Sequence, residues 1–269
     1  MEWGTFTPAH ILTLIAAAAI LVGLYFVLKN RPRKVQTAVL FCLSCSGIAA
    51  IIFNLVRWDS PLEYLPLHLC SINALILPVA VLTRSKVWCN LLLVWCLGAL
   101  AALIMNYEMT GTVIFGEAFN FYYFPHIFEF GIPLLLFKLG HVKKDVKCIG
   151  STLLITMLIY TLVHLCNLSI NHYCAAIGSD IRVNYMFSIN PTNPLVALFH
   201  NLVPFPYWYM YMVLPIVAGY LLIIYTPELM ANRKLITLRK QKPHNAKDRQ
   251  ASACRSFIRS DRAVFRFRW

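Results

Sequence analysis

The sequence predicts an all-α, polytopic membrane protein with seven transmembrane helices. Its composition, the lengths of its apolar segments and the placement of its basic residues lead to this prediction. Hydrophobic residues make up 59% of the 269 residues and charged residues only 13%, about half the charged share that is usual in a soluble domain. A bilayer core about 30 Å thick requires about 20 apolar residues per helix, and seven segments of the chain meet or approach this length.

The first three spans are expected over residues 9–28, 36–56 and 65–82. Glu2 but no basic residue precedes the first span and four basic residues follow it, so we interpret it as an uncleaved segment rather than a signal peptide. The third span opens at Leu65-Pro66. Proline suits the first helical position, where its missing N–H costs no hydrogen bond.

The remaining spans are expected over residues 87–105, 124–139, 148–167 and 203–225. The fifth is the shortest, and we expect it to begin earlier, near Phe121. The connection over residues 168–202 is the longest. Pro191, Pro194 and Pro204 argue against a continuous helix across its second half, and loops of this length are often functional lids.

The basic residues predict the orientation of these spans. With the N-terminus outside, every Lys and Arg except Arg57 and Arg182 falls on one side of the membrane. Positive charge is retained on the cytoplasmic face during insertion. The sequence therefore predicts an outside or lumenal N-terminus and a cytoplasmic C-terminus.

Two regions follow from this topology: a membrane domain over residues 1–227 and a basic cytoplasmic tail over residues 228–269, expected to be disordered. The tail contributes most of the formal charge of +13. Such a segment is attracted to anionic cytoplasmic lipids. The alternative is a tail that serves only to enforce topology. No motif for nucleic-acid binding accompanies the charge.

Polar side chains gather at the predicted outer ends of the spans. Groups of this kind cost several kcal/mol at membrane depth unless they face a cavity or one another. We interpret the layer as lining an intramembrane cavity, and the alternative is that its members lie in the headgroup zone. They are His10, Asn54, His68, Cys70, Asn73, Asn106, His126, Glu129, His164, His172, His200 and Asn201.

Within this layer, Cys70 and His126 are of the residue types used in nucleophilic catalysis. Cys70 is expected about one turn into the third span, with Asn73 on the same face. His126 falls in the first turn of the fifth span, where the helix dipole disfavours an imidazolium. Glu129, three residues on, can orient the ring. A thiol nucleophile needs a base, and the base benefits from an orienting group. The alternative is a structural cysteine and a hydrogen-bonded histidine.

The segments LPLHLC (65–70) and FPHIFEF (124–130), together with the basic-inside seven-span layout, resemble the YwaF-like family of integral membrane proteins over residues 6–227. The likeness is closer to the animal branch of this family, which comprises transmembrane acyltransferases of phospholipid remodelling. The resemblance implies that a polyunsaturated acyl chain moves from phosphatidylcholine to a lyso ether-phosphatidylethanolamine. It also implies that Cys70 is the nucleophile and His126 the base.

The implied mechanism is ping-pong transfer through a Cys70 thioester, with no cofactor and no metal. Asn73 and Asn106 are candidate donors to an oxyanion. His68 is two residues from Cys70 and is expected to point elsewhere, so it is at most a supporting residue. His200 is a candidate contact for a lipid headgroup.

Two other classes of protein remain open. A metal-dependent membrane lipid hydrolase would use the outer histidines as zinc ligands, but no H-x-x-x-H or H-E-x-x-H pair is present. A seven-span receptor or transporter would keep Cys70 and His126 as structural residues, but D-R-Y-like and N-P-x-x-Y signatures and matching halves are missing. An endoplasmic reticulum or Golgi membrane is expected for the acyltransferase if the protein is eukaryotic.

Overall fold

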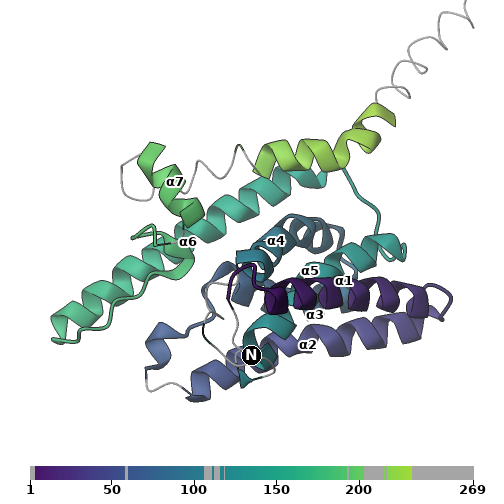
Figure 1. The fold of residues 1–269 in the computed structure, drawn as a ribbon. Helices are drawn as coiled ribbons and strands as arrows, with labels where there is room; N and C mark the ends of the chain where they lie inside the picture. The colour runs from purple at the N-terminus through teal and green to yellow at the C-terminus, as the bar shows by residue number, and fades with distance from the viewer. Residues whose placement is uncertain are drawn as a thin grey trace, which may run out of the picture. The chain divides into compact units, whose positions relative to one another are not determined.

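The computed structural model of the chain describes residues 4–57, 60–105, 111, 116–117, 119–192, 194–202, 215 and 217–231 (Figure 1). Every regular element within these ranges is a helix, as predicted. The chain forms two compact units, Met1–Ile223 and Ile224–Trp269. The helices α1 to α7 belong to the first unit.

Four helices are long and apolar enough to cross a membrane: α1 (Pro8–Leu28), α2 (Arg33–Arg57), α4 (Lys86–Met105) and α6 (Cys148–Ala176). Two shorter apolar helices are α3 (Leu69–Thr83) and Val217–Ala231. These apolar helices are those of a multi-pass transmembrane protein.

The fifth predicted span begins earlier than residue 124, as expected. A π-helical turn, η3 (Phe119–Tyr123), leads directly into α5 (Phe124–Lys138), so the chain is helical over residues 119–138. Pro125 lies at the start of α5. The added turn extends a helix that would otherwise be short for a membrane span.

Helix α3 begins four residues later than predicted. Residues 65–68 are not helical, and His68 is the extended N-cap residue with φ −72° and ψ 152°. Pro66 disfavours helical backbone at Leu65, and the Leu65 N–H donates to the Tyr185 hydroxyl at 3.2 Å. The expectation that Pro66 occupies the first helical position is therefore wrong.

The predicted start of the long connection is also wrong. Helix α6 continues to Ala176 instead of ending at residue 167, and the chain turns at Gly178, which has a φ of +70°. A short helix, α7 (Pro194–Leu202), lies in the second half of the connection, where no continuous helix was expected. Pro194 starts this helix rather than breaking it. Most of the predicted last span, residues 203–214 and 216, lies outside the described residues.

The core of the first unit lies where α2, α3, α4 and α5 pack together. Helix α2 contacts α3 and α5, α4 contacts α3, α5 and α6, and α1 contacts α5. Fully buried leucines, among them Leu40, Leu77 and Leu92, come from three of these helices. This packing fixes α3 and α5 against α2, and these are the helices that carry Cys70 and His126.

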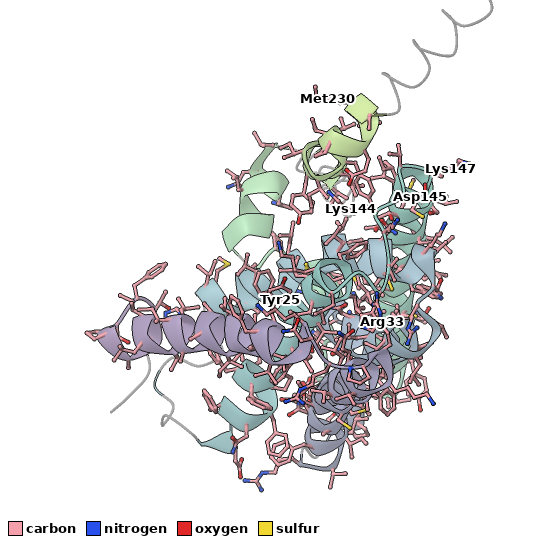
Figure 2. All side chains as sticks on the ribbon, turned by 90° about the vertical axis from the view of Figure 1, so that its right-hand side faces the viewer. Tyr25, Arg33, Lys144, Asp145, Lys147 and Met230 are labelled. Carbon is pink, nitrogen blue, oxygen red and sulfur yellow. The ribbon has the colours of Figure 1, made fainter. Side chains whose placement is uncertain are left out.

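At the ends of these helices that lie away from Cys70 and His126, basic side chains contact the connecting loops. Arg33 and Asp145 of this region are labelled in Figure 2. Arg33 donates to the Gly140 carbonyl at 3.1 Å, and Lys86 pairs with Asp145 at 3.7 Å. His141 Nε2 donates to Gln36 Oε1 at 2.8 Å. Burial, together with Arg33 and Arg84, lowers the pKa of His141 to about 4, so the ring is neutral at physiological pH.

Candidate active site

Cys70 is the second residue of α3 and is half-buried. It is a free thiol, as are the other cysteines in the described ranges. The predicted position one turn into the helix is wrong, because α3 begins at Leu69. The later start places the sulfur in the first turn, where the positive end of the helix dipole stabilises a thiolate.

His126 lies in α5 and is only 6% exposed. Its Nδ1 is 2.5 Å from the Tyr122 carbonyl oxygen. A carbonyl can only accept, so Nδ1 carries a proton, and in the neutral ring Nε2 is left with a lone pair. The ring is therefore held in the tautomer that a general base requires.

The predicted effect of the helix dipole on His126 is weaker in the structure. His126 is in the first turn of α5, but η3 continues the helix in the N-terminal direction. The positive end of the dipole then lies more than a turn away, and its effect falls off within one turn. The bond to Tyr122 fixes the tautomer of the ring.

Glu129 is 4% exposed and interacts electrostatically with both His126 and Cys70. One buried carboxyl group thus interacts with both the predicted nucleophile and the predicted base. Among the described residues, however, Glu129 Oε2 has no hydrogen-bond partner. The Tyr122 carbonyl takes the orienting role that was predicted for Glu129.

Gly47 on α2 makes room for this carboxyl group. A Cβ atom at Gly47 would lie 3.1 Å from Glu129 Oε1 and 2.6 Å from the Ala74 Cβ. Real Cβ atoms essentially never approach a neighbour as closely as the second distance. Gly47 was not among the predicted site residues. From the sequence it is distinguished only as a glycine within a predicted span.

Asn73, one turn below Cys70 on α3, is 1% exposed. Neither its Nδ2 nor its Oδ1 has a hydrogen-bond partner among the described residues. An unpaired buried amide costs about 1–3 kcal/mol, so such a group favours a partner beyond the described residues, such as a bound molecule. Asn106, the other candidate donor, lies outside the described residues.

His68 contacts the loop over residues 179–192, as its predicted direction away from Cys70 allows. Its Nδ1 accepts a hydrogen bond from the Met186 N–H at 3.3 Å, and its ring packs edge-on against Tyr185 at 5.2 Å between centroids. Since Nδ1 accepts, His68 helps to fix this loop. His200 lies in the last turn of α7.

Two asparagines of α6 clamp the same loop. Asn167 pairs with the backbone N–H and C=O of Tyr185 at 3.0 and 2.8 Å. Asn171, one turn on, pairs with the N–H and C=O of Val183 at 2.7 and 2.9 Å. The loop packs with Leu67, Leu69 and other apolar residues at the start of α3. It therefore covers the segment that leads into Cys70.

Nothing in the described ranges gathers three His, Cys, Asp or Glu side chains closely enough to hold a metal ion. The candidate site consists of four side chains: the thiol of Cys70, the imidazole of His126 with Nε2 as acceptor, the buried carboxyl group of Glu129 and the unpaired amide of Asn73. This set provides a nucleophile, a base and potential hydrogen-bond donors.

Comparison with known proteins gives one match. The model of the TMEM164 family matches residues 5–225 of the chain. This range is most of the chain, which therefore belongs to the TMEM164 family of transmembrane proteins. No curated protein and no solved structure matches the chain.

Proposed function

We propose that this member of the TMEM164 family is a membrane-embedded phospholipid acyltransferase. In this proposal it moves a polyunsaturated acyl chain from phosphatidylcholine to a lyso ether-phosphatidylethanolamine through a Cys70 thioester. The observation that carries the proposal is that a half-buried thiol, Cys70, and a His126 held in its Nδ1–H tautomer share one electrostatic partner. Glu129 interacts with both of them.

The proposed reaction has two half-reactions with His126 as the shared proton carrier. His126 Nε2 takes the proton of Cys70, and the thiolate attacks the donor ester. The carbon–sulfur bond forms as the ester C–O bond breaks, and His126 returns the proton to the leaving lysolipid oxygen. The acceptor hydroxyl then gives its proton to Nε2 and attacks the thioester. The Cys70 thiolate that leaves recovers this proton.

Transfer rather than hydrolysis requires that water be kept from the thioester. The clamped loop over residues 179–192 and its apolar contacts at the start of α3 support this requirement. A thioester is more reactive toward an oxygen nucleophile than the ester it replaces, so access to the site decides its fate.

The proposal also includes the number and orientation of the spans and the resemblance to the YwaF-like family. We infer seven spans, an outside or lumenal N-terminus, and membership in the YwaF-like group of acyltransferases. The location would be an endoplasmic reticulum or Golgi membrane, and the basic tail would contact anionic lipids. The apolar helices and the sidedness of the basic residues support these inferences.

The test is acyl transfer by the purified protein in nonionic detergent micelles, with a labelled acyl chain on phosphatidylcholine. The parent protein should acquire a hydroxylamine-sensitive acyl label and pass it to a lyso ether-phosphatidylethanolamine. Cys70→Ala should acquire no label. His126→Ala should form and transfer the thioester at least about 10²-fold more slowly, the range for loss of a positioned base.

Cys45→Ala is the matched control, because Cys45 is also a half-buried free thiol, on α2. It should behave as the parent does. Equal labelling of the parent and Cys70→Ala would overturn the proposal. Activity that resists alkylation but is lost with a chelator would favour the metal-dependent hydrolase. Ligand-dependent transport that survives Cys70→Ala would favour the receptor or transporter class.

A further inference from the structure

Asn73, one turn from Cys70 on α3, and Glu129, which interacts electrostatically with Cys70, both carry polar atoms without a partner among the described residues. Both are more than nine-tenths buried, at 1% and 4% exposure. Neither the Asn73 amide atoms nor Glu129 Oε2 has a hydrogen-bond partner among the described residues. Ala74, the neighbour of Asn73, and Glu129 Oε1 both lie next to Gly47. Glu129 of α5 therefore lies beside Gly47 of α2 at the turn of α3 that carries Asn73 and Ala74.

The residues around Glu129 offer no fixed cation. In the sequences of α1 to α5, the Lys and Arg residues occupy only helix ends: Arg33, Lys34 and Arg57 in α2, Lys86 in α4 and Lys138 in α5. The titratable groups that Glu129 meets are His126 and Cys70. His126 already donates its Nδ1 proton to Tyr122.

A buried carboxylate is ordinarily hydrogen-bonded or paired with a cation, because an isolated charge is costly in an apolar interior. Glu129 Oε2 has no such partner within the described ranges. A neutral carboxyl group fits this environment, and unlike a carboxylate it carries an O–H that can be donated.

We propose that Glu129, in its neutral form, and the Asn73 amide are the two hydrogen-bond donors that stabilise the oxyanion at Cys70. This inference rests on the proposed acyl transfer and assigns a role to the unpaired atoms. It also replaces the expectation that Glu129 orients His126. Gly47 serves the arrangement by leaving space for the carboxyl group between α2, α3 and α5.

The chemistry balances without any further reactant. When the Cys70 sulfur bonds to the ester carbon, the carbonyl π electrons move to oxygen. The O–H of Glu129 and the N–H of Asn73 then donate to that oxygen. The electrons return when the leaving oxygen departs with the proton from His126. Glu129 keeps its proton throughout, and each donor in such a site is worth about 10²–10³-fold in rate.

The test measures the single-turnover rate of Cys70 thioester formation from labelled phosphatidylcholine in nonionic micelles. Asn73→Ala and Glu129→Ala should each slow this step by about 10²-fold. Glu129→Gln should lose less than about tenfold, because its amide N–H replaces the carboxyl O–H. The rate of the parent should fall at alkaline pH, when Glu129 loses its proton, and this fall should be missing in Glu129→Gln.

A second measurement, alkylation of Cys70 by iodoacetamide against pH, does not require acyl transfer. Below the pH at which the acyl-transfer rate of the parent falls, a neutral Glu129 predicts equal alkylation rates for the parent and Glu129→Gln. A carboxylate would instead repel the thiolate and slow alkylation of the parent in that range. Glu63→Gln, at an exposed position of η1 (Pro61–Glu63), is the matched control. Folding of each variant is checked by its melting temperature.

The outcomes separate the two proposals. A parent that forms a Cys70-dependent thioester, with Glu129→Gln as slow as Glu129→Ala, would overturn the donor role alone. Asn73→Ala and Glu129→Ala variants that form the thioester at the rate of the parent would likewise overturn the donor role. Slower alkylation of the parent than of Glu129→Gln below the pH of the alkaline fall in the parent rate would also reject a neutral carboxyl group. A parent that forms no thioester would reject both the donor role and the acyltransferase.

Discussion

Gly47 is the residue on which the packing around Glu129 depends. Its position allows α2 to approach Ala74 on α3 while Glu129 Oε1 from α5 lies beside it. A side chain at this point would have to displace a helix backbone or move the carboxyl group. Because interiors are closely packed, an added methyl group in such a place costs about 1–3 kcal/mol.

Gly47→Ala is therefore expected to lower the melting temperature, even though alanine is a better helix former than glycine by about 1 kcal/mol. It should also slow Cys70 thioester formation, because the added Cβ displaces the Glu129 carboxyl group. Gly23→Ala on α1 is the matched control, since a Cβ there meets nothing within 4 Å. It should leave the melting temperature unchanged or raise it. Equal stability of both variants would contradict the close approach at Gly47.

Single residues also show how far the sequence could predict the site. The types and spacing of Cys70, His126 and Glu129 select them from the sequence as a catalytic set, which stays a prediction, and in the structure Glu129 interacts with both of the others. The partner of His126 could not be predicted, because it is the backbone carbonyl of Tyr122, which any residue type would supply. The role of Gly47 depends on two other helices, and no local pattern encodes such a contact.

At the scale of elements, the loop over residues 179–192 is held in an unfavourable conformation by α6. Met186 and Phe187 have φ values of 52° and 55°, which cost non-glycine residues of order 1–3 kcal/mol each. The clamps from Asn167 and Asn171 offset this cost with four hydrogen bonds to the loop backbone. Without them, we expect the loop to leave the start of α3.

Asn171→Ala should release one clamp and leave the N–H and C=O of Val183 without their partners. The expected loss is about 1–3 kcal/mol in the local stability of the loop. Hydrogen exchange of the amides of residues 183–188 would measure it, with exchange rising by about tenfold or more. Ser169→Ala is the control, because the Ser169 hydroxyl donates to the carbonyl of Leu165 within α6. Unchanged exchange in Asn171→Ala would mean that the clamp does not hold the loop.

The helices themselves were largely predictable, because long apolar runs bounded by basic residues indicate spans without knowledge of packing. The start of α3 and the end of α6 could not be predicted in this way. Helix α3 begins late because Leu65 bonds to Tyr185, a residue 120 positions away in the sequence. Helix α6 continues past residue 167 because its asparagines pair with loop backbone instead of water. Both ends are set by contacts between segments distant in sequence.

At the scale of the whole molecule, the proposed orientation can be tested with two substitutions that each create a glycosylation site. Pro191→Ala converts Asn190-Pro191-Thr192 into an acceptor sequon, in the connection proposed to be lumenal. Pro32→Ser does the same at Asn30-Arg31-Pro32, in the connection proposed to be cytoplasmic. Asn190 and Asn30 are both exposed. The natural sequon at Asn167 should remain unused, because this side chain is fully buried and hydrogen-bonded to the loop.

Expression in cells with a glycosylating endoplasmic reticulum should therefore give a glycosidase-sensitive mass increase for Pro191→Ala only. This pattern would place the C-terminal end of α6 at the lumenal side, together with the start of α3 and Cys70. It would place the basic loops in the cytoplasm. Modification of Pro32→Ser alone would invert the topology and place the thioester chemistry on the cytoplasmic leaflet. Modification of the parent would mean that Asn167 is exposed before the loop closes over α6, so the clamp would form only after insertion.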